Sequence, residues 1–133
     1  MPDIFFYGLF MDDDLLRAQG MKPARPRRGS VDGFALRIGR RATLVPDPAG
    51  RVHGTVVDLS FAEIDRLYAE PSLRDYRPEA VIVRQEAADP VAALCFVLPE
   101  PPAADERNED YAARLKDVAA RLGLPDGYVR SIA

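Results

Sequence analysis

Near the start of the chain lies the stretch Ile4-Phe5-Phe6-Tyr7-Gly8-Leu9-Phe10-Met11-Asp12, which predicts the first two elements of the fold. Its first four residues are β-formers in an apolar run, which predicts a buried strand that ends at Gly8. Two further aspartates follow Asp12 and precede two leucines, a pattern typical of the first turn of a short helix. Gly20 predicts the end of that helix. The chain therefore begins with a strand that leads directly into a helix.

The remaining sequence contains more predicted strands than helices. The predicted strands cover residues 31–38, 42–45, 51–59, 76–85 and 91–98. A last long helix is predicted from about Asn108 to Leu122, with an apolar stripe of Tyr111, Leu115, Val118 and Leu122. A Ser-x-x-Glu capping box at Ser60 and Glu63 begins another helix, whose apolar face is Ile64, Leu67 and Tyr68, and Pro71 ends it. Residues 22–28 hold two prolines and are predicted to be an irregular connector, whereas residues 46–50 are predicted to be a turn.

Strands that are joined mostly by turns, with a few helices between them, predict an α+β fold. We expect a mixed sheet that is strongly bent or forms a small β-barrel, with the helices packed against its outside. The length of 133 residues fits a single domain that spans residues 1–133. The composition, with 47% hydrophobic and 29% charged residues, is that of a globular domain and not of a disordered chain.

Composition also argues against several classes of function. No apolar run approaches the roughly 18 residues that a membrane-spanning helix needs, so we expect no membrane association. No basic segment precedes the first apolar run, which favours a cytoplasmic protein without a secretory signal. Cys95 and His53 are the only residues of their kinds, so we expect no disulfide and no metal site built from cysteines or histidines. The net charge of −3 argues against a nucleic-acid partner, and the oligomeric state stays open.

The first candidate site is the loop Tyr7-Gly8-Leu9-Phe10. A glycine between a strand and a helix allows a tight turn, so the N–H groups of Leu9, Phe10 and Met11 can point into one cleft. Such an arrangement attracts a carboxylate or a developing oxyanion. The same residues also fit a plain turn after a buried strand, and the nearby aspartates oppose an anion site unless they face away.

The second candidate is Glu70, which follows an apolar helix face and lies six residues before Tyr76. Partial burial would raise the pKa of such a carboxyl and allow it to carry a proton. A solvated glutamate at a helix end is the alternative interpretation. Basic clusters at residues 22–28 and 37–41 could indicate RNA binding, but the negative net charge favours solvated strand faces there.

Taken in order, these segments resemble the gamma-glutamylcyclotransferase-like family, including its avirulence-induced-gene-like branch. The resemblance rests on the segments Phe5–Asp12, Gly33-Phe34-Ala35-Leu36, Val52–Leu59, Ile64–Glu70, Tyr76–Val81, Gly123-Leu124-Pro125 and Tyr128-Val129. It covers nearly the whole chain, and it depends on the order and spacing of the motifs together.

The resemblance implies a small β-barrel flanked by helices and an enzyme of the lyase or acyltransferase type. Such an enzyme releases an amine or amino acid from a small-molecule gamma-glutamyl substrate while 5-oxoproline forms, without a metal or organic cofactor. The family's general acid/base falls on Glu70, and its tyrosine at the start of the next strand falls on Tyr76. Its substrate-binding loop falls on Tyr7, Gly8, Leu9 and Phe10.

Two residues depart from the pattern of the family. Leu9 stands where Ser or Thr is usual, which removes a hydroxyl donor, and Pro71 replaces the Gly that commonly follows the acid, which removes an N–H. Both departures favour an alternative function, a non-catalytic small-molecule binding module on the same fold, whereas Glu70 favours an enzyme. The sequence leaves the particular gamma-glutamyl compound open.

Overall fold

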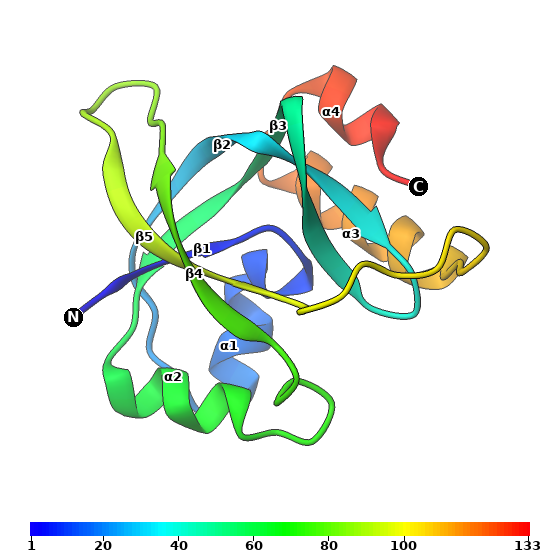
Figure 1. Ribbon diagram of the computed structural model, residues 1–133. Helices are drawn as coiled ribbons and strands as arrows, with labels where there is room; N and C mark the ends of the chain where they lie inside the picture. The colour runs from blue at the N-terminus through cyan, green and yellow to red at the C-terminus, as the bar shows by residue number, and fades with distance from the viewer.

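A five-stranded mixed sheet forms the centre of the computed structural model, which describes residues 1–133 (Figure 1). The strands are β1 (Asp3–Phe6), β2 (Ala24–Ile38), β3 (Ala42–Asp58), β4 (Arg77–Val83) and β5 (Val91–Val97). The helical elements are the 3₁₀ helix η1 (Leu9–Met11) and the α-helices α1 (Asp13–Ala18), α2 (Phe61–Tyr68), α3 (Glu109–Arg121) and α4 (Asp126–Ser131). The strand order is β2-β3-β1-β5-β4, with β1 and β5 parallel and the other neighbours antiparallel. The predicted α+β class is confirmed.

The sheet is bent so strongly that its two edge strands, β2 and β4, meet. One antiparallel bridge joins them: the Ser30 N–H donates to the Arg84 carbonyl at 3.0 Å, and the Arg84 N–H donates to the Ser30 carbonyl at 2.8 Å. Gly29, beside this bridge, has no room for a side chain, because a β-carbon there would lie 2.3 Å from Cγ1 of Val83. The predicted bent sheet is therefore confirmed, but a single bridge does not make it a fully closed barrel.

Apolar side chains fill the inside of the bend. Residues without exposed surface come from strands and helices alike: Ile4, Leu16, Val52, Val56, Leu59, Val83, Cys95, Leu115 and Ala119. Helix α3 carries the predicted apolar stripe, with Val118 buried and Tyr111 half-buried. The Asn108 side chain accepts a hydrogen bond from the Tyr111 N–H at 3.1 Å and so caps α3. Because α3 packs against η1, it reaches the loop that follows β1.

Helix α2 begins at the predicted capping box. The Glu63 N–H donates to Oγ of Ser60 at 3.1 Å, and the Ser60 N–H donates to Oε1 of Glu63 at 2.9 Å. Ile64 and Leu67 are buried and hold the helix against the sheet. None of the helices combines the length and the apolar composition needed to cross a membrane.

The connector predicted at residues 22–28 is wrong from Ala24 onward, because β2 begins there. Pro26 is tolerated since β2 is an edge strand and its register against β3 shifts within this segment. Arg25 lies in the shift and has a φ of 50°, in the left-handed region. Its Nε lies 2.7 Å from a carboxylate oxygen of Asp58, which fastens the irregular start of β2 to the end of β3.

The turn predicted at residues 46–50 is also wrong, because β3 continues through it. Pro46 pairs with Phe34 of β2, and Arg51 pairs with Asp32, so the intervening residues of β3 form an irregular bulge. Pro48 lies in this bulge, outside the paired positions, so its missing N–H interrupts no pairing between β2 and β3 and the strand can continue through it.

Candidate functional site

A cavity of about 390 Å³ opens where β1 leads into η1. We call it the tyrosine cavity, because it is defined by Tyr7, Tyr68, Tyr76 and Tyr111. The other residues around it are Phe5, Phe6, Gly8, Leu9, Phe10, Leu15, Ala18, Gln19, Arg40, Arg41, Ala42, Ser72, Leu73 and Phe96. Thirteen of the eighteen are hydrophobic, so a ligand inside would be largely withdrawn from water.

Two of the tyrosine hydroxyls donate to backbone carbonyls. The Tyr7 hydroxyl donates to the carbonyl of Phe96 at 2.7 Å, which ties the end of β1 to β5. The Tyr76 hydroxyl donates to the carbonyl of Ala42 at 2.5 Å, which ties the segment before β4 to the start of β3. Both hydroxyl protons are used in hydrogen bonds within the protein, and these bonds hold the two rings in place as walls of the cavity.

In contrast, the hydroxyl of Tyr111 accepts a hydrogen bond. The donor is the Leu9 N–H at 3.2 Å, and this contact brings α3 onto the loop after β1. Because its oxygen accepts here, its own proton stays available for another acceptor.

The ring of Tyr68 is held by aromatic packing. It stacks on Phe96 with ring centroids 3.9 Å apart and planes inclined by 15°, and it is tilted toward Tyr76 at 6.3 Å. Tyr68 is the last residue of α2, so the end of that helix supplies part of the cavity wall.

Burial raises the pKa of each of the four tyrosines. The pKa of Tyr7 and of Tyr68 lies well above the ordinary value, that of Tyr76 rises to about 12, and that of Tyr111 is raised although its bond from Leu9 opposes the rise. All four hydroxyls are therefore protonated and neutral near pH 7. They can donate and accept hydrogen bonds, but they do not act as general bases.

Arg41 adds a positive charge to the wall of the tyrosine cavity. Its Nη1 donates to the carbonyl of Ser72 at 3.2 Å, and its Nη2 lies 3.3 Å from a carboxylate oxygen of Asp75. The guanidinium carbon also lies 5.7 Å from the centre of the Tyr76 ring, within the range of a cation–π contact. These contacts fasten the β2–β3 turn to the segment before β4.

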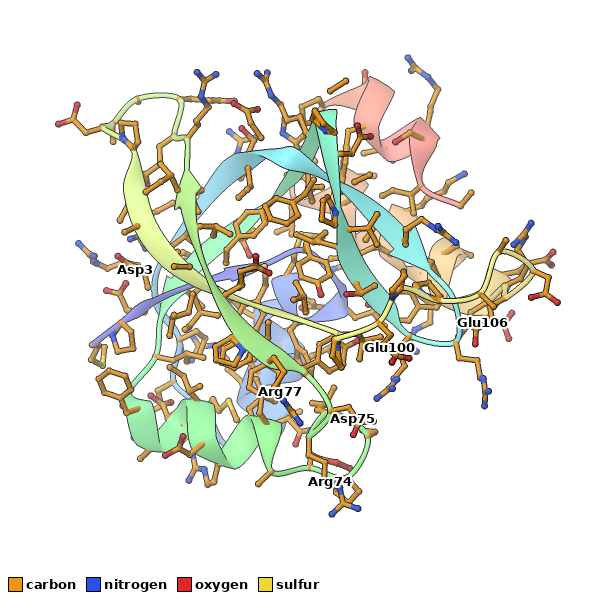
Figure 2. All side chains as sticks on the ribbon, in the orientation of Figure 1. Asp3, Arg74, Asp75, Arg77, Glu100 and Glu106 are labelled. Carbon is orange, nitrogen blue, oxygen red and sulfur yellow. The ribbon has the colours of Figure 1, made fainter.

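A second cleft, of about 640 Å³, adjoins the tyrosine cavity through Arg40 and Arg41, which border both. Its other charged residues are Asp75, Arg77, Glu100 and Glu106. Figure 2 shows Arg77 and Asp75 in the lower middle of the molecule and Glu100 and Glu106 to the right of them, whereas Asp3 lies apart on the left. A ligand that extends through both spaces would hold its less polar part in the tyrosine cavity and its charged part in this cleft.

The structure brings most of the residues predicted for the site together. The tyrosine cavity is bordered by Tyr7, Gly8, Leu9, Phe10 and Tyr76. The cluster of N–H groups predicted at Leu9, Phe10 and Met11 forms only in part, because Leu9 donates to Tyr111 and Met11 donates to the carbonyl of Gly8 at 3.0 Å within η1. Of these three, only Phe10 keeps an N–H without an acceptor in the protein.

Glu70 is not among the residues that border the tyrosine cavity. It is exposed beyond the end of α2, so the partial burial expected from its position is not found. Its carbonyl accepts hydrogen bonds from the N–H groups of Leu73 at 2.9 Å and Arg74 at 3.0 Å. It thus begins a turn whose later residues, Ser72 and Leu73, do border the cavity. No carboxylate borders the cavity.

Sequence reasoning missed four residues of the site. Tyr68 and Tyr111 were assigned to the apolar faces of their helices, and Arg40 and Arg41 to a basic cluster. A usable signal existed for the tyrosines, since a tyrosine on an aliphatic stripe brings a hydroxyl that needs a partner. For the arginines there was none, because their place depends on the β2–β3 turn reaching a segment 31 residues away in sequence.

A profile of the family "Gamma-glutamyl cyclotransferase, AIG2-like" matches residues 4–115. No curated protein matches the chain in sequence.

Several solved structures are similar to this chain. An uncharacterized protein from Homo sapiens is similar with a TM-score of 0.83 and 17% identity, over 99% of this chain and 88% of that one. A gamma-glutamyl cyclotransferase is similar with a TM-score of 0.81 and 16% identity, over 98% and 87%. An AIG2-like protein from Mus musculus is similar with a TM-score of 0.57 and 18% identity, over 83% and 90%. At these identities the structures show a common fold and nothing finer.

Proposed function

Because the chain belongs to the gamma-glutamyl cyclotransferase, AIG2-like family, we propose that its tyrosine cavity binds a gamma-glutamyl compound and that the chain converts this compound to 5-oxoproline. One observation carries the proposal. The Tyr7–Phe10 loop and Tyr76, which the family pattern associates with substrate, border a single cavity of about 390 Å³. That volume lies within the range of ordinary small-molecule sites.

The proposed reaction needs no second substrate. The α-amino nitrogen of the glutamyl group attacks its own γ-carbonyl carbon, and the carbonyl oxygen becomes an oxyanion. The bond from that carbon to the leaving nitrogen then breaks, and the proton lost by the α-amine is transferred to the leaving amine. The products are 5-oxoproline and the free amine. A cavity that holds the chain folded favours the attack, because ring closure depends on the position of two groups in one molecule.

The cavity supplies hydrogen-bond donors for this reaction. Phe10 and Tyr111 both border the tyrosine cavity, and the Phe10 N–H and the Tyr111 O–H have no acceptor in the protein. Both are neutral donors suited to a carbonyl oxygen that gains negative charge. In an apolar cavity such donors act more strongly than they do in water.

We propose Glu70 as the group that takes the proton from the α-amine and returns it to the leaving amine. Its support is the family pattern together with its place at the start of the turn that carries Ser72 and Leu73 to the cavity. The exposed carboxylate must turn inward when substrate is present for this role.

A second candidate function follows from the position of Glu70. Its exposure, and the absence of any carboxylate around the cavity, favour a binding module that holds its ligand without converting it. The two candidates share one cavity and differ only in turnover.

Release of 5-oxoproline from a panel of gamma-glutamyl amino acids and gamma-glutamyl amines tests the proposal. Turnover of any member supports the enzyme. Binding of panel members without turnover supports the binding module, and neither binding nor turnover contradicts both.

A further inference from the structure

The hydroxyl of Tyr68 has no hydrogen-bond partner in the protein, although Tyr68 borders the tyrosine cavity. The other three hydroxyls each have one, since Tyr7 and Tyr76 donate to backbone carbonyls and Tyr111 accepts from a backbone N–H. The Tyr68 oxygen is not sealed in the core either, because the buried oxygens that lack a partner are those of Thr55 and Tyr128. The free hydroxyl therefore faces space that a ligand or water can reach.

The position of this hydroxyl is fixed rather than adaptable. The Tyr68 ring lies flat against Phe96 with centroids 3.9 Å apart, and Tyr76 packs beside it at 6.3 Å. A hydroxyl that has no partner in the protein bonds to water in the empty cavity, and a ligand that places an acceptor opposite it replaces that water. A rigid, unpaired donor of this kind distinguishes between ligands by the atom placed opposite to it.

We propose that Tyr68 is a specificity-determining residue whose hydroxyl donates a hydrogen bond to the acyl oxygen of the bound glutamyl group or lactam. The identity of the ligand rests on the proposed function, whereas the hydrogen bond itself requires only binding. An oxygen acceptor fits better than an ammonium group, because Arg40 and Arg41 border the same cavity and no carboxylate does.

The arrangement has a consequence for turnover. The acyl oxygen that receives the bond is the oxygen that becomes negative when the ring closes, so the same hydroxyl contributes more to the transition state than to the ground state. Removal of the hydroxyl then lowers kcat in addition to weakening the binding of ligands that carry the oxygen.

The test compares two ligands and three proteins. The ligands are 5-oxoproline and cyclopentanecarboxylate, which share a five-membered ring and a carboxylate but differ in the ring amide and its oxygen. The proteins are wild type, Tyr68→Phe and the control Tyr128→Phe. The control also removes a tyrosine hydroxyl that donates to no acceptor in the protein, but Tyr128 lies outside the tyrosine cavity.

Titration calorimetry should show that Tyr68→Phe binds 5-oxoproline roughly fivefold more weakly than wild type, the usual effect of one neutral hydrogen bond. Its affinity for cyclopentanecarboxylate should be unchanged, and Tyr128→Phe should match wild type with both ligands. Equal affinities of wild type and Tyr68→Phe for 5-oxoproline, or absence of binding to wild type, would overturn the proposal.

The outcome for Tyr68 is separable from the outcome for the reaction. If wild type releases no 5-oxoproline from the panel but Tyr68→Phe shows the selective loss, the proposed turnover fails and the role of Tyr68 stands. If wild type turns over a panel member and Tyr68→Phe matches it in both kcat and affinity, the reaction stands and the role of Tyr68 fails.

Discussion

The hydroxyl of Tyr111 packs so closely against Gly8 that a β-carbon on Gly8 would lie 2.5 Å from its oxygen. The same oxygen accepts the hydrogen bond from Leu9, so α3 and the loop after β1 meet at a single point. The missing side chain of Gly8 is what allows α3 to complete the wall of the tyrosine cavity.

Gly8→Ala should therefore displace Tyr111 and open the cavity on the side of α3. We expect a loss of about 1–3 kcal/mol in the free energy of unfolding, the usual cost of forcing an extra methyl group into a packed site. The affinity for 5-oxoproline should fall as well. Urea unfolding and titration calorimetry measure the two effects.

The matched control is Gly127→Ala in α4, where the nearest atom to a new β-carbon lies 3.9 Å away. Alanine is favoured over glycine within a helix, so this change should leave stability equal or higher by up to about 1 kcal/mol. A Gly8→Ala protein as stable as wild type and with unchanged affinity would show that the close contact is dispensable.

Glu70→Gln keeps the size of the side chain and removes its titrating proton. If Glu70 is the acid/base, the rate of 5-oxoproline release should fall by about 10²–10⁴-fold. Stability should hardly change, because Glu70 is exposed. The control is Glu86→Gln, another exposed glutamate, on the β4–β5 connection. Equal rates for wild type and Glu70→Gln would assign the proton transfer to another group.

Tyr76→Phe removes the hydroxyl that donates to the carbonyl of Ala42. The cost should be about 0.5–1.5 kcal/mol of unfolding free energy, because the bond ties the segment before β4 to the start of β3. Chemical denaturation of this variant, compared with Tyr128→Phe, gives the measurement. The Tyr128 hydroxyl donates to no acceptor in the protein, so the Tyr76 variant should lose more stability than the Tyr128 variant. Equal destabilisation of both would mean that the Ala42 bond contributes nothing.

Asp58 predicts how stability depends on acid pH. Burial alone would raise the pKa of Asp58, but the hydrogen bond and charge of Arg25 and the charge of Arg27 outweigh burial and lower it to about 2. A carboxyl whose pKa is lower in the folded than in the unfolded protein contributes stability that is present above about pH 4 and is lost as the pH falls toward 2. Stability on the order of 2 kcal/mol should disappear over this window.

Asp58→Asn should remove that part of the pH dependence, which unfolding curves recorded from pH 5 to pH 2 would reveal. Asp75→Asn serves as the control, because its carboxylate is mostly exposed beside Arg41. A wild-type profile that Asp58→Asn leaves unaltered would contradict the role assigned to the Arg25–Asp58 pair.

The elements that the sequence predicted well are those with local signals. The capping box at Ser60 and Glu63, the start of the last helix at about Asn108 and the apolar stripe of α3 each depend on residues within a few turns. The errors arose where a partner strand decides the conformation. Pro26 lies in β2 because that strand is at the edge of the sheet, and edge position is a property of the whole sheet.

The candidate site likewise contains residues that local motifs predicted and residues that no local signal indicated. The loop after β1 and Tyr76 were predicted from short motifs, and both border the cavity. Tyr68 and Tyr111 are 43 residues apart, and nothing local to either indicates that the two helices present them to one space. The orientation of Glu70 likewise depends on a turn that forms only when Ser72 and Leu73 pack against the cavity.

Cys95, the lone thiol, lies within β5 next to Phe96, whose carbonyl holds Tyr7. It has no exposed surface, and burial raises its pKa to about 12 with a further contribution from Glu79. A thiol reagent can therefore react only with molecules in which β5 has come away from its surroundings. The rate at which this single sulfur is labelled therefore reports how often β5 opens, and Phe96 of that strand borders the tyrosine cavity. A ligand that stabilises the closed protein should slow the labelling, without any engineered probe.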